Sequence, residues 1–513
     1  MGDTTRSKVA VVRSVALTGF DGKLIEVETD MKAGLPSLQI VGMGNKAIDE
    51  ARQRVRSAIS NSLLEFPARK LTVNLAPAEL PKDGTHLDLP IALSVLVASG
   101  QLKSKEIANA VFAGELALDG RVRSIRGAVV IAEAARSAGA LCVFLPLQNV
   151  AQARLVTGIG IIGVASLQEL FRHLRGFELI NPLSVKAETS VTTPTPRGAG
   201  ASPTIDDIIG HDQAKRALAI AAAGRHNLLL SGPPGTGKTL IIRALASLLP
   251  PLTSSEILEV TKLHSLVNDT AGTVVTAPPF RAPHHSVTLT ALIGGGLKPQ
   301  PGDISLAHKG VLFLDELPEY PRATLEALRQ PLEDRTVSLS RLYGRITYPA
   351  DILLAATMNP CPCGYLGDTT TPCTCSGAQI ANYQKRISGP LLDRIDLRLT
   401  VSKISAEHFF STNTLQEKQH LKVLKLILTA REVQKKRFKR SNFYNAYASI
   451  EDAKRVFNTT KSAHSLLKAA ANKLQLSSRA SLRVLRVART IADIDNSETL
   501  DSQHVAEALQ FRG

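Results

Sequence analysis

The chain has 513 residues, a length that corresponds to about three domains of ordinary size. Its 61 Lys and Arg residues outnumber its 45 Asp and Glu residues, so the formal net charge is +16. Such a surplus favours a polyanionic partner, because basic surfaces release counterions when they bind phosphate groups. A hydrophobic content of 44% excludes a wholly disordered chain, and few aromatic residues argue against recognition by stacked aromatic platforms.

Membrane and secreted proteins are also disfavoured. The apolar stretches fall short of the roughly 20 residues that a membrane-spanning helix needs, and the first residues do not form a signal core. Four of the five cysteines lie between positions 361 and 375, which is not the pattern of a secreted disulfide framework. We therefore expect a cytoplasmic protein that has no membrane partner.

Residues 1–175 alternate strand-like and helical segments, which predicts an α+β domain. The expected strands are Val9–Leu17, Leu24–Glu28, Lys70–Leu75 and Leu141–Pro146, and the expected helices are Asp49–Asn61 and Leu89–Ser99. Residues 176–204 are rich in Ser, Thr, Pro, Gly and Ala. That composition is typical of a linker, because it buries little apolar surface.

Residues 205–402 predict an α/β core with a parallel sheet, because apolar strands alternate with helical segments. The expected strands of this core are Asn227–Ser231, Val311–Leu314 and Ile352–Thr357. Residues 403–513 are helical in pattern and basic, which predicts a separate helical domain. Its expected helices are Ala463–Gln475, Ser478–Ala492 and Ser502–Phe511.

A glycine-rich segment follows the first strand of the core and matches the pattern G-x-x-x-x-G-K-[ST]. It consists of Gly232, Pro233, Pro234, Gly235, Thr236, Gly237, Lys238 and Thr239. In such a phosphate loop the backbone N–H groups surround phosphate oxygens, and the next helix directs its positive N-terminus at them. The segment predicts an ATP site in which Lys238 reaches the β- and γ-phosphates and Thr239 coordinates Mg²⁺.

Polar residues end two further strands of the core. Asp315 and Glu316 follow Val311–Leu314. We expect Asp315 to hold Mg²⁺ and Glu316 to polarise the water that attacks the γ-phosphate, which predicts hydrolysis as well as binding. Asn359 ends the next strand, and from the residues alone two interpretations stay open. In one interpretation Asn359 positions the attacking water, and in the other it forms a turn with Pro360.

Four cysteines follow Asn359 within fifteen positions, namely Cys361, Cys363, Cys373 and Cys375. Four thiolates suit a tetrahedral Zn²⁺ site, although the C-x-C spacing is tighter than the usual gap of about two to four residues. A structural zinc ion, reduced free thiols and a redox pair all remain open at this point. Cys142 lies in an apolar segment and is expected in a hydrophobic core.

The order of these motifs resembles that of AAA+ ATPases, and longer segments resemble the magnesium-chelatase-like ComM family. The segments that carry this resemblance are Val73–Ala78, Leu87–Pro90, Phe280–Ser286, Gly294–Gly296, Pro301–His308, Phe313–Glu319, Asn359–Gly364 and Ser388–Asp396. The resemblance covers nearly the whole chain. It implies a homohexameric ATPase that moves on single-stranded or branched DNA. In this family the motor is a helicase that promotes branch migration during homologous recombination in natural transformation.

The resemblance assigns a role in trans to one arginine. Arg394 matches the arginine finger that reaches the γ-phosphate of the neighbouring subunit, which requires an oligomeric ring. An ion pair with Asp393 or Asp396 is the alternative role for Arg394. Arg386 is a competing candidate for the finger.

The resemblance also indicates a sensor arginine and two channel insertions. Arg479 matches the sensor arginine of the helical lid, and Arg483 and Arg486 lie near it in sequence. Residues 277–308 form one insertion, and residues 336–348 predict a hairpin that turns at Tyr343 and Gly344. Both insertions face the central channel in this branch of AAA+ proteins. The candidates for contacts with DNA phosphates are Lys298, Lys309, Arg341 and Arg345. The alternative for each of them is a surface charge that has no partner.

The N-terminal domain is similar to the protease domain of Lon. The similarity rests on Gly114–Gly127 and Lys82–Gly84, and it places His86 at the position of the nucleophilic Ser and Val129 at that of the catalytic Lys. A Ser–Lys dyad needs a hydroxyl and an amine. We therefore expect a Lon-protease-like fold without proteolysis, with a role as a scaffold or in binding a partner or DNA.

Taken together, these features favour an ATP-driven DNA motor. A magnesium-chelatase-type ATPase subunit is the first alternative, and the fused Lon-like domain and the basic charge weigh against it. An ATP-driven remodelling scaffold without DNA translocation is the second alternative.

Overall fold

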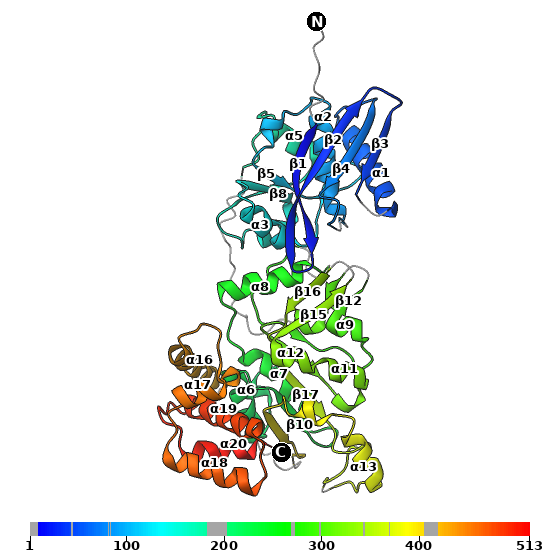
Figure 1. Ribbon diagram of the computed structural model, residues 1–513. Coiled ribbons are helices and arrows are strands. Elements are labelled where there is room, and N and C mark those ends of the chain that lie inside the picture. Colours follow the sequence, from blue (N-terminus) through cyan, green and yellow to red (C-terminus); the bar gives the residue numbers. More distant parts are fainter. Residues whose placement is uncertain are drawn as a thin grey trace.

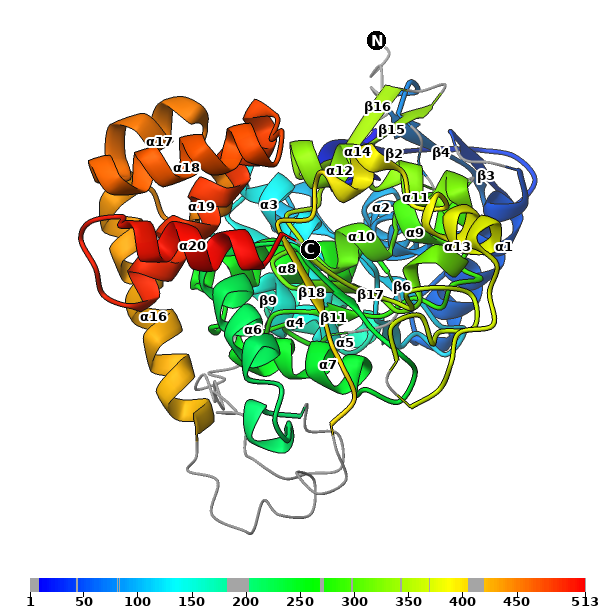
Figure 2. The ribbon, with the colours of Figure 1, turned by 90° about the horizontal axis from the view of Figure 1, so that it is seen from below.

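The computed structural model describes residues 9–42, 45–80, 82, 84–181, 203–267, 272–296, 299–341, 344–368, 370–404 and 419–512. An N-terminal α/β body lies at one end of the molecule, and a second α/β core adjoins it (Figure 1). A helical C-terminal body lies at the side of this core, as the view from below shows (Figure 2). Most of the predicted linker, residues 182–202, lies outside the described residues.

The N-terminal body is built on a seven-stranded mixed sheet. In sheet order the strands are β3 (Ser37–Val41), β4 (Lys70–Ala76), β2 (Asp21–Lys32), β1 (Ala10–Thr18), β5 (Ala110–Phe112), β8 (Cys142–Pro146) and β9 (Gly160–Val164), and a small hairpin joins β6 (Glu115–Leu116) to β7 (Val122–Arg123). The helices are α1 (Asn45–Asn61), α2 (Asp88–Ala98), α3 (Ala128–Ser137), α4 (Val150–Ala153) and α5 (Leu167–Leu174). Helix α2 is apolar on all sides because it packs beneath β1 and β2.

The core contains a five-stranded sheet in which every strand pair is parallel. In sheet order the strands are β11 (Phe280–Arg281), β14 (Val311–Leu314), β17 (Leu353–Met358), β10 (Leu228–Ser231) and β18 (Leu397–Thr400). Its helices are α6 (Asp212–Gly224), α7 (Lys238–Leu248), α8 (Ser254–Ser265), α9 (Leu289–Ile293), α10 (Asp303–Leu306), α11 (Arg322–Ala327), α12 (Arg329–Asp334), α13 (Gly377–Gln384) and α14 (Gly389–Leu392). The three central strands, β14, β17 and β10, are almost entirely apolar, as expected for strands whose two faces are both covered. This confirms the predicted α/β core, and it brings the carboxyl ends of β10, β14 and β17 to one edge.

Two short hairpins interrupt the core where the channel insertions are expected. One pairs β12 (Gly294–Gly295) with β13 (Gln300–Pro301), and the other pairs β15 (Thr336–Arg341) with β16 (Gly344–Pro349). Gly344 begins β16 and pairs with Arg341, so the expectation that Gly344 lies in the turn is wrong. Lys298, Tyr343 and the side chain of Arg341 lie outside the described residues. Arg345 is exposed and donates from Nη2 to Ser338 Oγ at 3.0 Å, and it stays a candidate for DNA contact.

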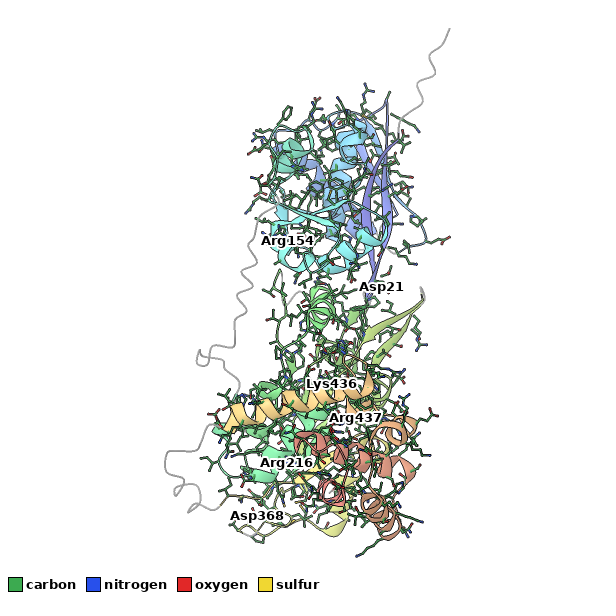
Figure 3. The ribbon with its side chains drawn as sticks, turned by 90° about the vertical axis from the view of Figure 1, so that its left-hand side faces the viewer. Asp21, Arg154, Arg216, Asp368, Lys436 and Arg437 are labelled. Atoms are coloured by element: carbon green, nitrogen blue, oxygen red, sulfur yellow. The ribbon has the colours of Figure 1, made fainter. Side chains whose placement is uncertain are left out.

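The N-terminal body contacts the core through the hairpin formed by β1 and β2. The ring of Phe20, in the turn of this hairpin, meets buried Tyr348 of β16 edge-on at 6.5 Å between centroids. Lys262 of α8 lies over the Phe20 ring at 4.1 Å and pairs with Glu133 of α3 at 2.7 Å. In the side view, Asp21 at the tip of the hairpin marks this junction (Figure 3). The junction therefore fixes the base of the β15–β16 hairpin against the N-terminal body.

The C-terminal body consists of helices packed beside α6. They are α16 (Gln419–Phe438), α17 (Ile450–Val456), α18 (Lys461–Lys473), α19 (Ser478–Ile494) and α20 (Ser502–Gln510). This confirms the predicted helical lid. Arg489 is completely buried in α19 and pairs with Asp493 at 2.9 Å, which satisfies its charge inside the body. In the part of the chain that the structure describes, no helix combines the length and the apolar character needed to cross a bilayer.

A buried charge network attaches this helical body to the core. Asp351, which precedes β17, accepts from Lys309 Nζ at 2.8 Å and from the hydroxyl of Tyr447, and it lies 3.9 Å from the guanidinium of Arg225. The prediction that Lys309 contacts DNA phosphates is wrong, because its side chain is 11% exposed and its charge is paired. Three segments distant in sequence thus meet at one carboxylate.

Asp351→Asn is expected to lower the free energy of unfolding by about 3 kcal/mol at neutral pH, because it leaves buried cations without their counter-charge. Burial raises the pKa of Asp351, but the charges of Arg225 and Lys309 outweigh it and hold this pKa well below its ordinary value. A lowered carboxyl pKa contributes stability above the unfolded value of about 3.9 and loses that contribution as the pH falls further. The free energy of unfolding, measured with denaturant, should therefore fall more on acidification in wild type than in the variant.

The exposed pair of Asp119 and Arg121 provides the control for this stability measurement. Asp119→Asn should leave the free energy of unfolding nearly unchanged, because solvent screens an exposed ion pair. Equal stability of Asp351→Asn and wild type at neutral pH would contradict the assigned role of the network.

Candidate active site

The phosphate loop spans Gly232 to Thr239 and joins the end of β10 to the start of α7. Gly235 and Gly237 both have φ of +78°, a left-handed backbone that side chains rarely adopt, and Gly237 caps α7. A Cβ on Gly232 would lie 2.2 Å from the carbonyl oxygen of Val401, so only glycine fits there. The glycines of the motif therefore shape the loop and leave the N-terminus of α7 free to face phosphate groups.

Lys238, the first residue of α7, connects the loop to the neighbouring strand. Its Nζ donates to the carbonyl oxygens of Gly232 at 2.6 Å and Pro233 at 2.8 Å, and to Asn359 Oδ1 at 3.3 Å. Burial lowers the pKa of Lys238, against the attraction of the nearby acidic pair. The structure thus brings together two predicted site residues that are 121 positions apart in sequence.

The acidic pair lies at the end of β14, next to the loop. Thr239 Oγ1 donates to Asp315 Oδ2 at 3.1 Å, so a hydroxyl and a carboxylate that suit Mg²⁺ lie side by side. Thr357 of β17 donates its hydroxyl to Asp315 and accepts the backbone N–H of Glu316 at 3.1 Å. Glu316 has φ of +53°, a strained conformation that the turn after the strand holds in place.

Two features of this site escaped the sequence analysis. Thr357 holds both members of the acidic pair, and its only signal was a hydroxyl at the end of an apolar strand. A pocket also adjoins the loop and is lined by Gly210, His211, Asp212, Gln213, Ala214, Leu399, Thr400, Val401, Ser402, Lys403 and Ile404. His211 contacts the backbone of Thr236, so the pocket is continuous with the phosphate loop. Its place beside the loop suits the nucleoside end of a nucleotide.

The two arginines considered for the arginine finger, Arg394 and Arg386, pair with acidic residues outside the phosphate loop. Arg394 donates from Nη1 to a carbonyl oxygen at 2.7 Å and pairs through Nη2 with Glu333, not with Asp393 or Asp396. Arg386 pairs with an acidic residue of the turn after β14 at 3.1 Å. Among the described residues, no hydrogen bond joins either guanidinium to the phosphate loop. The finger role of Arg394 stays a prediction about the neighbouring subunit.

The lid arginines lie near the segment that carries Arg394. Arg479 is exposed in the first turn of α19, and Arg483, one turn further, pairs with Asp393 at 2.9 Å. Arg486 donates from Nε to a carbonyl oxygen within the lid at 2.7 Å. The exposed side chain of Arg479 thus remains the sensor candidate on this face, and its role stays a prediction.

The four clustered cysteines converge in the loop between β17 and α13. Their Sγ atoms all lie within 4.8 Å of one another, and the residues are Cys361, Cys363, Cys373 and Cys375. All four are free thiols in the structure, and the group is compatible with a metal ion. The backbone N–H groups of Tyr365 and Thr374 lower the pKa of the Cys363 thiol to about 6. Cys142 lies half-buried on β8, against the core of the N-terminal body.

In the N-terminal body, His86 and Val129 occupy the positions that correspond to the Ser–Lys dyad of the Lon protease domain. His86 is buried, its Nε2 lies 2.9 Å from the carbonyl oxygen of Val15, and burial lowers its pKa. Val129 is completely buried in α3. Neither side chain provides the hydroxyl or the amine of a Ser–Lys dyad, as the sequence predicts.

A phosphate loop on a central parallel strand, an acidic pair on one neighbouring strand and a helical lid define this chain as a P-loop ATPase of the AAA+ class. Family comparisons agree with this class. Residues 204–409 match the family "Magnesium chelatase, subunit ChlI", residues 27–149 match "Subunit ChlI of Mg-chelatase", and residues 418–512 match its C-terminal family.

Comparison with individual proteins narrows the assignment. "Competence protein ComM" of Haemophilus influenzae is 41% identical over 98% of this chain and 97% of its own length. "Uncharacterized protein YifB" of Escherichia coli is also 41% identical, with the same coverage. "Lon protease 2" of Bacillus subtilis is 28% identical over 34% of this chain and 31% of that protein. The chain belongs to the ComM/YifB family of magnesium-chelatase-like AAA+ proteins.

Proposed function

We propose that the protein is a cytoplasmic, homohexameric DNA helicase that uses ATP to promote branch migration during homologous recombination in natural transformation. The observation that carries this proposal is that the side chains needed for ATP hydrolysis lie together at one site in a chain similar to a competence protein. That set consists of Lys238, Thr239, Asp315, Glu316 and Asn359. The cofactors required are ATP and Mg²⁺, and the four clustered cysteines offer a place for Zn²⁺.

The chemistry of ATP hydrolysis suits the positions of these side chains. Thr239 and Asp315 would hold Mg²⁺ through a hydroxyl and a carboxylate, and the bound ion would supply charge neutralisation at the β- and γ-phosphates. Lys238 supplies a positive charge at the mouth of the loop. Glu316 accepts a proton from the attacking water, and Asn359 hydrogen-bonds that water and orients it.

A ring and a DNA channel complete the proposal. Arg394 would leave Glu333 and reach the γ-phosphate of a neighbouring subunit, which couples hydrolysis to the contact between subunits. The formal charge of +16 favours a polyanion, and Arg345 on the exposed hairpin offers one contact for its backbone. Movement of this hairpin with the ATP cycle would then pull on DNA.

A four-way DNA junction with a fluorophore and a quencher on separate strands tests the motor directly. Wild type with ATP and Mg²⁺ should convert the junction into duplex products, whereas a non-hydrolysable ATP analogue should not support conversion. Conversion that is equally fast with the analogue, or none with ATP in a sample that hydrolyses ATP, would contradict the helicase proposal.

A magnesium-chelatase-type ATPase subunit is the second candidate, favoured by the family descriptions that match this chain. It predicts ATP hydrolysis that depends on a metal-inserting partner and on a porphyrin instead of on DNA. Porphyrin metallation stimulated by this chain, together with ATP turnover indifferent to DNA, would favour that candidate over the motor.

A further inference from the structure

The cysteine loop, residues 361–375, follows the active-site strand β17 and leads to α13. It begins two residues after Asn359, the residue that contacts Lys238, and it ends at the residue before the cap of α13. In the side view, Asp368 of this loop lies at the end of the molecule farthest from the N-terminal body (Figure 3). The loop is thus part of the wall of the ATP site and not part of the channel hairpins or the domain junction.

The sulfur atoms have the spacing of a metal centre. Cys361 Sγ lies 3.3 Å from Cys363 Sγ and 3.6 Å from Cys373 Sγ, and the latter two are 3.5 Å apart. Four thiolates around one Zn²⁺ at about 2.3 Å each would stand about 3.8 Å apart, a little more than the distances seen here. A donor set made only of thiolates favours zinc over magnesium or calcium, because the latter two ions prefer oxygen ligands.

The cysteine loop contacts the phosphate loop through a glycine. Gly364 has φ of +86°, and a Cβ at this position would lie 2.8 Å from Pro234 Cδ. The backbone of the cysteine loop at Gly364 therefore touches the Pro234 ring of the phosphate loop. A displacement of the cysteine loop would move the outer side of the phosphate loop or leave it unsupported.

The cysteine loop also contacts the pocket beside the phosphate loop. Asp368, whose side chain is 2% exposed, pairs with Lys403, and Thr370 Oγ1 accepts from the same Nζ at 3.2 Å. The Nζ of Lys403 lies 5.4 Å from the centroid of the Tyr365 ring. Lys403 is itself a lining residue of the pocket. The cysteine loop thus contacts both the phosphate loop and the pocket beside it.

We infer that the four clustered cysteines bind one Zn²⁺ and that the bound ion fixes the cysteine loop against Pro234 and Lys403, so that nucleotide affinity depends on the metal. The metal site stands on the sulfur geometry alone, and the dependence of affinity rests on the proposed ATPase function. Removal of the ion would release the links between the two ends of the loop, which carry Cys361 and Cys363 on one side and Cys373 and Cys375 on the other, and would leave the contacts with Pro234 and Lys403 to hold it.

Metal content of the purified full-length chain tests the first part. Wild type should hold about one zinc ion per chain by elemental analysis, and Cys373→Ser should lose most of it. Cys142→Ser is the matched control, because it removes the remaining cysteine, which lies on β8 of the N-terminal body, and should keep the zinc. A wild-type chain that takes up no zinc after incubation with Zn²⁺ would overturn the site, as would full zinc in Cys373→Ser.

Binding of a fluorescent ATP analogue tests the second part. Release of zinc from wild type by an organomercurial, followed with a colorimetric chelator, should weaken analogue binding about tenfold. Asp368→Asn keeps all four thiols, so it should keep the zinc and bind the analogue about threefold more weakly. Unchanged affinity after complete zinc release would overturn the coupling. Lys238→Ala should keep the zinc and lose ATP hydrolysis, so failure of the ATP site and failure of the metal site are distinguishable.

Discussion

Lys238→Ala is expected to abolish ATP hydrolysis, with a loss of about a thousandfold in the rate of phosphate release. The reason is that Lys238 places its positive charge between the phosphate loop and Asn359, where the charge of the γ-phosphate develops during transfer. Steady-state phosphate release with saturating ATP and Mg²⁺ measures the effect.

The exposed Lys385, at the end of α13, provides the control for this substitution. Lys385→Ala removes the same charge from the same core and should leave turnover unchanged. Turnover near the wild-type rate in Lys238→Ala would contradict the assignment of the ATP site to the phosphate loop.

Glu316→Gln is expected to keep ATP binding and to slow hydrolysis by about a hundredfold to ten-thousandfold. Glutamine preserves the size of the side chain and the backbone contact with Thr357, but it cannot accept the proton of the attacking water. Binding of a fluorescent ATP analogue and a single-turnover assay separate the two steps. The variant should accumulate in the ATP-bound state, and a ring that forms with ATP should persist in it.

Glu319→Gln is the control for Glu316→Gln, because Glu319 lies in the turn directly after the acidic pair and is paired with Arg386. It should hydrolyse ATP nearly as fast as wild type. Wild-type turnover in Glu316→Gln would remove Glu316 from the catalytic role.

Local sequence patterns predicted the parts of the fold that depend on neighbours along the chain. The glycines of the phosphate loop and the apolar strand Val311–Leu314 are such features, and the structure places both as expected. The predicted strand Leu24–Glu28 is too short, because β2 extends from Asp21 to Lys32 through its pairing with β1 and β4. The short strands β3, β5 and β9 were not predicted, since their pairing partners lie far away in sequence.

Contacts between distant segments could not be predicted from one sequence. Lys309 is a basic residue that directly follows an insertion, and only the fold shows that Asp351 neutralises it. The partner of Arg394 is Glu333, 61 positions away, and not an acidic neighbour in sequence. Thr357 likewise became visible as a site residue only when β17 was placed beside β14. In each case a tertiary ion pair or hydrogen bond, and not a local pattern, decides the environment of the side chain.

The measurement that tests the central claim most directly is ATP hydrolysis with and without single-stranded and branched DNA over a series of salt concentrations. We expect strong stimulation by DNA that fades as salt rises, because a basic channel binds the phosphate backbone by releasing counterions. We also expect no stimulated turnover in Lys238→Ala. ATP hydrolysis that DNA leaves unchanged at every salt concentration would contradict the proposal of an ATP-driven DNA motor.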